Sequence, residues 1–243
     1  MKFYSILIFI SIIFCESGYE LAQRMSQKNT PTDIKLSLIM HLEDKRGNIF
    51  ESEIISHSKD NGKKQIMWFL SPASNRGAAL YKIEKDNGRN EMKMYLPAFN
   101  DKIRKINSKN KSNSFMNSDL TFEDLYNRDL NDYTYDLDHS DDSFYILTSY
   151  PIKSLKSAYS KHISWIDKNT LLIKKEESYA KSGRLMKTKE MKYINQDGFD
   201  LIQELHVLDV KTRHKTHLIF KDIQLNTGID DNEFHEMKLK QIP

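Results

Sequence analysis

The chain has 243 residues, and 39% of them are hydrophobic, which is enough apolar material to build the core of one large domain or two small ones. Its 37 basic and 34 acidic residues leave a net charge of only +3 and are interspersed along the chain rather than gathered in blocks. This balance argues against a nucleic-acid partner, because a charge-driven partner requires positive charge concentrated on one surface.

The first 17 residues have the pattern of an export signal that is cleaved from the mature protein. A positive start, Met-Lys, is followed by an apolar run from Phe3 to Phe14 and then by polar sequence. This run is shorter than the roughly 20 residues that a helix needs to cross a bilayer, so we expect cleavage rather than permanent anchoring. Residues 18–243 are then expected to form a single domain that works outside the cytoplasm.

The only cysteine, Cys15, stands where a bacterial lipoprotein would carry its lipid-modified cysteine. The residues at 12–14 are bulkier than those that usually precede such a cysteine. We therefore favour cleavage after Ser17 or Gly18 over a lipid anchor at Cys15. Such cleavage leaves the mature chain without a disulfide, so its stability must come from its core.

Apolar periodicity predicts a mainly β protein with a few helices. Residues 18–28 place apolar side chains on one face of a helix, whereas residues 34–42 alternate as in a strand with one buried face. Further alternating runs are separated by glycine turns, which predicts ten or more antiparallel strands in one meander. The turns are KRGN at 45–48, DNGK at 60–63, DNGR at 86–89, KSGR at 181–184 and QDGF at 196–199.

A sheet of this size curls because its strands twist, and its apolar concave face then needs a cover. We expect helices to supply this cover: the N-terminal helix, a helix at 121–129 and a short C-terminal helix at 230–240. Thr121 and Asp124 have the spacing of a capping box at the start of the middle helix. The acidic residues there, which include Asp119 and Glu123, are explained by capping and by the helix dipole.

Five blocks of the sequence resemble the outer-membrane lipoprotein-sorting protein family, a group of bacterial periplasmic proteins related to the lipoprotein carrier. They follow the order of the family and span most of the mature chain. The blocks are WFLSPASNRGAALY at 68–81, MYLPAFNDKIRKI at 94–106, NSFMNSDLTFEDL at 113–125, WIDKNTLLIKKEESYAKSGRLMK at 165–187 and NTGIDDNEFHEMKL at 226–239.

The resemblance implies an unclosed antiparallel β-barrel, or half-barrel, with helices covering an apolar cavity. This fold carries acyl chains across the periplasm, and family members often accompany an inner-membrane transporter of the RND type. The chain departs from the family pattern at Asn117, where a glycine is usual, and at Phe122, where a tyrosine is usual. Asn tolerates left-handed backbone better than other non-glycine residues, so we expect the turn to survive.

The candidate site is the acyl cavity and the segment that covers it, with residues selected from strand alternation and from the family blocks. Phe115 and Met116 are expected there either as cavity residues or as ordinary core. The cavity residues are Leu38, Met40, Trp68, Leu70, Met94, Leu96, Phe115, Met116, Phe122 and Leu125. Arg76, Arg104 or Arg128 could hold the cover in place through bonds to helix-end carbonyls or carboxylates, although surface ion pairs are the commoner role of such arginines.

Two functions are consistent with these patterns, and neither is enzymatic. One is a monomeric periplasmic carrier of lipoproteins or lipids, for which an open apolar cavity is needed. The other is a non-carrying accessory subunit of an RND-type transporter, for which a filled cavity would suffice. A basic stretch at 100–113 could contact anionic headgroups or a transporter, or could be a solvated loop.

The sequence offers no catalytic motif such as G-x-S-x-G, H-E-x-x-H or paired C-x-x-C, and we predict no enzyme activity and no cofactor. His214 and His217 have a spacing that suits zinc on a helix. They fall in a predicted strand, however, where residues three apart point to opposite faces, so no metal site is predicted.

Overall fold

The structure is a computed structural model that describes residues 16–85, 90–97, 102–138 and 141–243. Residues 1–15 of the expected signal peptide, the DNGR turn at 86–89 and residues 100–101 of the basic stretch lie outside the described residues. Within these described ranges, thirteen strands form one antiparallel sheet. They are β1 (Asp33–Glu43), β2 (Ile49–Lys59), β3 (Lys64–Phe69), β4 (Ala79–Ile83), β5 (Glu91–Tyr95), β6 (Ile103–Lys105), β7 (Tyr133–Asp138), β8 (Phe144–Pro151), β9 (Tyr159–Asp167), β10 (Ile173–Ala180), β11 (Leu185–Gln196), β12 (Phe199–Asp209) and β13 (Lys215–Leu225).

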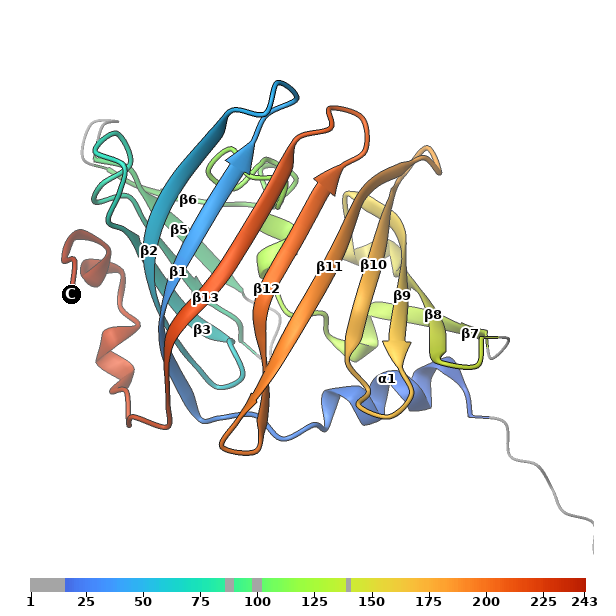
Figure 1. Ribbon diagram of the computed structural model, residues 1–243. Helices are drawn as coiled ribbons and strands as arrows, with labels where there is room; N and C mark the ends of the chain where they lie inside the picture. The colour runs from blue at the N-terminus through green and yellow to red at the C-terminus, as the bar shows by residue number, and fades with distance from the viewer. Residues whose placement is uncertain (1–15, 86–89, 98–101, 139–140) are drawn as a thin grey trace, which may run out of the picture.

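The sheet consists of two meanders rather than the single meander predicted from the sequence. The strand order runs from β6 through β1 to β13 and on to β7, so the first and last strands of the chain pair at the centre of the sheet (Figure 1). In this pairing His41 lies opposite His217, and Leu38 lies opposite Phe220. The sequence could not reveal this arrangement, because turn signals identify neighbouring hairpins but not pairs of distant strands.

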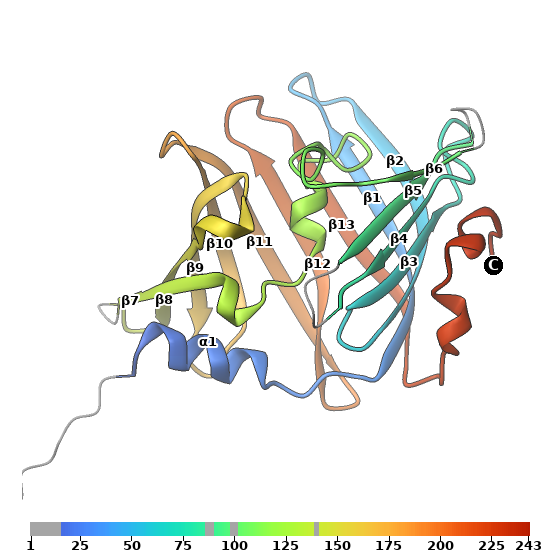
Figure 2. The ribbon, with the colours of Figure 1, turned by 180° about the vertical axis from the view of Figure 1, so that it is seen from behind.

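The sheet curls into a half-barrel that does not close, as predicted. Its edge strands are β6 and β7, and among the described residues these two do not pair with each other. They are consecutive in the chain but lie at opposite edges, so the chain between them must cross the open side of the half-barrel. This crossover segment, residues 106–132, covers the concave face (Figure 2).

The helices cover different parts of the sheet. Helix α1 (Gly18–Ser26) begins with a capping box between Ser17 and Glu20, and it buries Leu21 against Leu147 of β8 and Ile166 of β9. This confirms the predicted N-terminal helix. No helix within the described ranges is long and apolar enough to span a membrane.

The two other predicted helices are shorter than expected. The middle one is a single 3₁₀ turn, η1 (Phe122–Leu125), followed after an extended stretch by η2 (Leu130–Asp132). Its capping box between Thr121 and Asp124 is present, but the chain must extend to reach the far edge strand, and this ends the helix. A further 3₁₀ turn, η3 (Lys153–Leu155), follows β8.

The C-terminal segment forms two 3₁₀ turns, η4 (Asp231–Glu233) and η5 (Glu236–Lys240), on the outer face of the sheet instead of over the cavity. There Phe234 and Leu239 pack against Trp68. The buried Asp33 carboxylate accepts backbone hydrogen bonds from residues 227–229 and so fixes the start of this segment. The outer face of β3–β5 is therefore as well covered as its inner face.

The glycine turns that lie within the described residues are at their predicted places. Gly62 and Gly198 have φ angles of +74° and +83°, in the left-handed region that glycine adopts without steric cost. The residues preceding them, Asn61 and Asp197, also have positive φ, as expected for the tight turns that join twisted strands.

Candidate functional site

The half-barrel encloses a cavity of about 490 Å³ between its concave face and the crossover segment. Most of its wall is apolar and comes from the inward-facing positions of β1, β12 and β13, joined by three residues of the crossover segment. The apolar lining comprises Ile34, Leu36, Leu38, Met40, Met67, Met191, Leu201, Ile202, Leu205, Leu218, Phe220, Ile223, Phe115, Leu120 and Leu125. Alternation in β1 therefore identified the residues that this strand contributes, which are Ile34, Leu36, Leu38 and Met40.

One end of the cavity is formed by the chain that leads into β1 and by the adjacent strand ends. Thr32, Lys59 and Asp200 belong to this end. Lys28 ties the same stretch of chain to the sheet, since its ammonium group donates hydrogen bonds to the Asp200 carboxylate (2.8 Å) and to the Thr170 carbonyl (2.5 Å). This end of the cavity is thus polar, as is the part of the wall formed by Asp124, Glu176 and Lys189, whereas most of the wall is apolar.

On the side of β3, the crossover segment is held by aromatic packing. The Phe115 ring lies 5.9 Å from the ring of Phe69 in β3 and 5.9 Å from that of Phe122, measured between centroids. All three rings are buried. Edge-to-face and tilted contacts at this separation stabilise aromatic pairs beyond the effect of buried area. This packing anchors the start of the crossover segment over the cavity.

A tight turn places Phe115 in this position. Met116 and Asn117 both have left-handed backbone, with φ angles of +48° and +62°. The Ser118 hydroxyl donates a hydrogen bond of 2.6 Å to the Phe115 carbonyl, and the Phe115 amide donates one of 2.8 Å to the Leu120 carbonyl. Asn117 therefore adopts the conformation that its tolerance of left-handed backbone predicted.

On the opposite side, the crossover segment is held by buried charges. The Asp124 side chain is 1% exposed, and its carboxylate accepts hydrogen bonds from Lys187 (3.0 Å) and Lys189 (2.8 Å) of β11. The Tyr159 hydroxyl donates a further hydrogen bond of 2.8 Å. Because the Thr121 amide also donates to this carboxylate, Asp124 both caps η1 and joins it to the wall.

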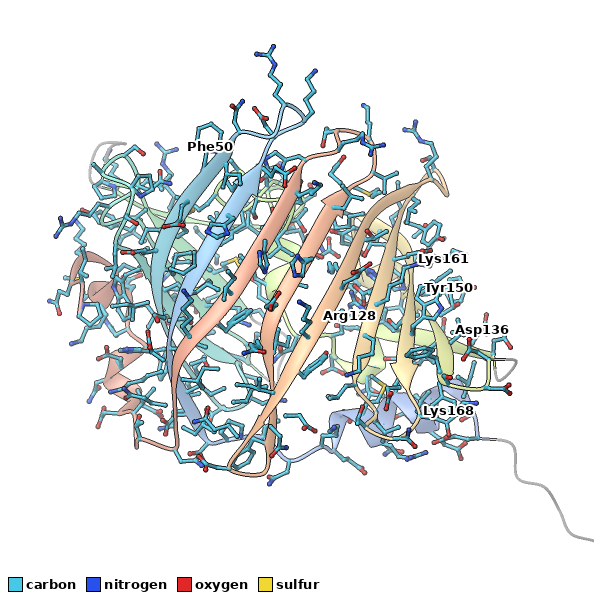
Figure 3. The ribbon with its side chains drawn as sticks, viewed as in Figure 1. Phe50, Arg128, Asp136, Tyr150, Lys161 and Lys168 are labelled. Atoms are coloured by element: carbon cyan, nitrogen blue, oxygen red, sulfur yellow. The ribbon has the colours of Figure 1, made fainter. Side chains whose placement is uncertain are left out.

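A second carboxylate, that of Glu176 in β10, extends this network. Lys189 bonds it at 3.2 Å, and the Arg128 guanidinium binds it through two nitrogens at 2.5 and 2.8 Å. Arg128 also contacts the buried His162 ring at 3.2 Å. Figure 3 shows Arg128 behind β10 and β11, on the inner side of the sheet. We call Asp124, Lys187, Lys189, Glu176 and Arg128 the inner ion network.

The charged groups of this network shift one another's pKa values and so determine their protonation states. Burial alone would raise the pKa of Asp124, but Lys189 and Lys187 outweigh it and hold that pKa well below its usual range. Burial is likewise outweighed at Glu176, whose pKa is lowered by Arg128 and Lys189. Burial, reinforced by Arg128, lowers the pKa of His162 to about 3, so this ring is neutral at pH 7.

Sequence analysis did not predict the inner ion network. It explained Asp124 by capping alone and placed Arg128 as one of three possible latches. One signal was present: in β11, Lys187 and Lys189 have the same parity as Met191, which faces the cavity. That parity could be used only once the inner face of β11 was known.

Of the ten predicted cavity residues, Leu38, Met40, Phe115 and Leu125 line the cavity. Four more belong to the surrounding apolar core on the concave side, namely Met94, Leu96, Met116 and Phe122. Leu70 follows β3 and is half-buried, and it is absent from the lining.

The position predicted for Trp68 is wrong. Its ring is fully buried on the outer face of β3, where its indole N–H donates a hydrogen bond of 2.9 Å to the Lys238 carbonyl. Met67 and Phe69 are the β3 residues that face the concave core. Both faces of this strand are buried, so its continuous apolar run does not indicate which residues face inward.

Of the three possible latch residues, Arg128 joins the crossover segment to the wall through its contacts with Glu176 and His162. Arg76 is exposed in the turn between β3 and β4, and Arg104 is an exposed residue of the edge strand β6. His214 and His217 contact different carboxylates. His214 contacts Asp119 at 2.8 Å, while His217 lies on the outer face near Glu204.

Solved structures of other proteins share this open antiparallel half-barrel. A structure described as a putative outer membrane lipoprotein-sorting protein domain from Vibrio parahaemolyticus is 24% identical, with a TM-score of 0.84, and the match covers 92% of this chain and 98% of that one. A LolA superfamily protein from Nitrosomonas europaea is 19% identical, with a TM-score of 0.72 over 92% and 99% of the two chains. These likenesses confirm the predicted fold.

A DUF1329 family protein from Desulfovibrio piger is also similar, at 28% identity and a TM-score of 0.82, over 91% of this chain and 97% of that one. A family model described as "Uncharacterized protein" matches residues 61–241, and because this is more than half of the chain, the protein belongs to that family. A comparison with curated proteins finds no match. None of the three similar structures is named as an enzyme.

Proposed function

We propose that the protein is a periplasmic carrier that binds the acyl chains of lipoproteins or lipids in the cavity of the half-barrel. The observation that carries this proposal is the cavity itself: about 490 Å³ remain between the apolar wall and the crossover segment. This volume is within the usual range for small-molecule sites, roughly 300–1,000 Å³. An accessory subunit that carries nothing would have no need of such a space.

The apolar wall supplies affinity without directed chemistry. Each buried methylene contributes about 0.8 kcal/mol, so ten methylenes contribute about 8 kcal/mol before the cost of association is subtracted. Met40, Met67 and Met191 belong to the wall. Their flexible thioether side chains adapt to chains of different conformation. The polar end of the cavity near Thr32 and Lys59 is where the headgroup of such a ligand would leave the protein.

The similar structures support this assignment through their fold, since one is described as a lipoprotein-sorting domain and another as a LolA superfamily protein. The periplasmic location rests on the apolar run at 3–14 and on this likeness. We further propose that the carrier acts as a single-domain monomer and that an inner-membrane transporter of the RND type loads or unloads it, as the family resemblance implies.

The proposal is tested by native mass spectrometry of the mature protein purified from a bacterial envelope, followed by extraction and identification of lipids. Co-purifying acyl lipid or lipoprotein is the expected result. An empty protein that also fails to bind added diacyl lipid would contradict the carrier and favour the accessory subunit.

Two substitutions on one strand provide a matched pair for this test. Leu36 lines the cavity, whereas Ile39 lies on the opposite face of β1. Leu36→Asp places a carboxylate against the acyl chain and is expected to reduce lipid binding about tenfold or more, because burying an unpaired charge is costly. Ile39→Asp is expected to leave binding unchanged. Equal binding by the two variants, both folded by circular dichroism, would remove this wall from the site.

A further inference from the structure

The outer face of the sheet carries three histidines side by side at its centre. His41 of β1 lies opposite His217 of β13, which lies opposite His206 of β12. These three strands are neighbours in the sheet (Figure 1). The three histidine side chains point away from the cavity. Each is next in sequence to a residue that lines the cavity, namely Met40, Leu218 or Leu205, and successive residues of a strand point to opposite faces.

Glu204 completes a cluster with two of these histidines. It is two residues before His206 and therefore on the same face of β12. One of its carboxylate oxygens, Oε2, is 2.9 Å from His206 Nε2 and 3.2 Å from His217 Nε2. The donor atoms of these three side chains thus converge at one point. The side chains are 24–42% exposed, so an ion from solvent can reach them.

These spacings fit a zinc ion. Around a tetrahedral zinc with ligand bonds of about 2.0–2.1 Å, two ligand atoms lie about 3.3 Å apart. The separations of 2.9 and 3.2 Å require only small movements to reach this value. The two imidazole rings are stacked, with centroids 3.9 Å apart and planes inclined by 17°, so one ring must turn for both to point at the ion. His206, with 42% of its side chain exposed, has room to do so.

We propose that Glu204, His206 and His217 form a binding site for a divalent transition metal of the zinc class on the outer face of the half-barrel. Two imidazoles and one carboxylate are a ligand set that zinc uses when a fourth position stays open to water or to another ligand. All three side chains are partly exposed, so a fourth ligand could approach from solvent. His41 lies nearby, with its ring centre 5.9 Å from that of His217.

A neighbouring lysine competes with the metal for the carboxylate. Lys192 of β11 donates a hydrogen bond of 3.1 Å to the same Oε2 atom of Glu204. A metal bound to this oxygen atom competes with the ammonium group for it. The Lys192→Met variant is therefore expected to bind the metal up to about fivefold more tightly, the range that corresponds to loss of a surface ion pair.

The test measures zinc binding to tag-free mature protein by isothermal titration calorimetry, with magnesium as the comparison ion. We expect zinc to bind at one site and magnesium not to bind, because imidazole selects transition metals over magnesium. His206→Ala and His217→Ala should each weaken zinc binding about tenfold or more. His235→Ala is the control, because His235 is an exposed histidine of the C-terminal segment, outside this cluster. This substitution should leave zinc binding unchanged.

Cobalt provides a second readout, since its visible absorption reports imidazole ligation and four-coordinate geometry directly. Absence of zinc binding in the parent protein would overturn the proposal. So would zinc binding that is unaffected in both His206→Ala and His217→Ala. The site is on the opposite face from the acyl cavity, so lipid binding by the same variants should not change, and the two proposals can fail independently.

Discussion

The two sides of the crossover segment are held in different ways. Near β3, the buried Phe115 ring packs against the rings of Phe69 and Phe122. Near β10 and β11, Asp124 and Arg128 form ion pairs that require one geometry. Both sides contribute to the cavity lining, the aromatic side through the Phe115 ring and the charged side through Asp124. The ion pairs of the charged side also fix where the segment crosses the cavity.

The largest effect is expected on the charged side. Asp124→Ala leaves Lys187 and Lys189 buried beside each other without their shared carboxylate. Breaking a buried ion pair in this way costs about 3–5 kcal/mol. Urea unfolding followed by circular dichroism should record this loss.

Asp136→Ala is the control for that measurement. Asp136 is an exposed carboxylate of β7 (Figure 3), and its removal should change stability by no more than about 0.5 kcal/mol. Similar losses in the two variants would show that the inner ion network does not hold the segment.

Lowering the pH should reduce the free energy of unfolding through the titratable groups of the charged side. The neutral His162 of the folded protein has a pKa of about 3, below its ordinary value of 6.5, so the unfolded chain takes up this proton first as the pH falls. Stability is therefore lost between pH 6.5 and about 3, by up to about 1.4 kcal/mol per pH unit. Asp124 and Glu176, whose pKa values are also lowered, add further losses below their ordinary values of 3.8 and 4.5.

Thermal unfolding between pH 4.5 and 7 measures this dependence. His162→Gln should have a shallower slope in this range than the parent protein, because it lacks one of the groups that titrate on unfolding. Parallel slopes would contradict the low pKa of His162.

The smallest effect is expected at the turn on the aromatic side. Asn117→Gly removes the steric cost of a left-handed backbone in the folded state, but it also gives the unfolded chain more conformational freedom. These two contributions oppose each other, so the free energy of unfolding should change by no more than about 1 kcal/mol. Asn117→Val places a β-branched residue in the same conformation and should destabilise the protein more. Chemical denaturation of both variants checks this order, and a more stable Val variant would contradict it.

The sequence predicted those features that depend on near neighbours. Alternation in β1 identified Leu38 and Met40 as inward-facing, and the residue type of Asn117 predicted its backbone. Features that depend on strand pairing were not predicted. The contact of Asp124 with Lys187 joins residues that are 63 positions apart in the sequence. Trp68 on the outer face bonds to Lys238 of the C-terminal segment, which is 170 positions away.

The two edge strands of the sheet, β6 and β7, have a consequence for the size of the ligand. A closed barrel has a diameter that is set by its number of strands and their stagger. Here the described strands do not close the circle, so strand number and stagger do not fix the width of the bore. The crossover segment, tied to β3 on one side and to β10 and β11 on the other, sets that width instead. The space available to a ligand therefore depends on a segment outside the sheet rather than on the strand ladders.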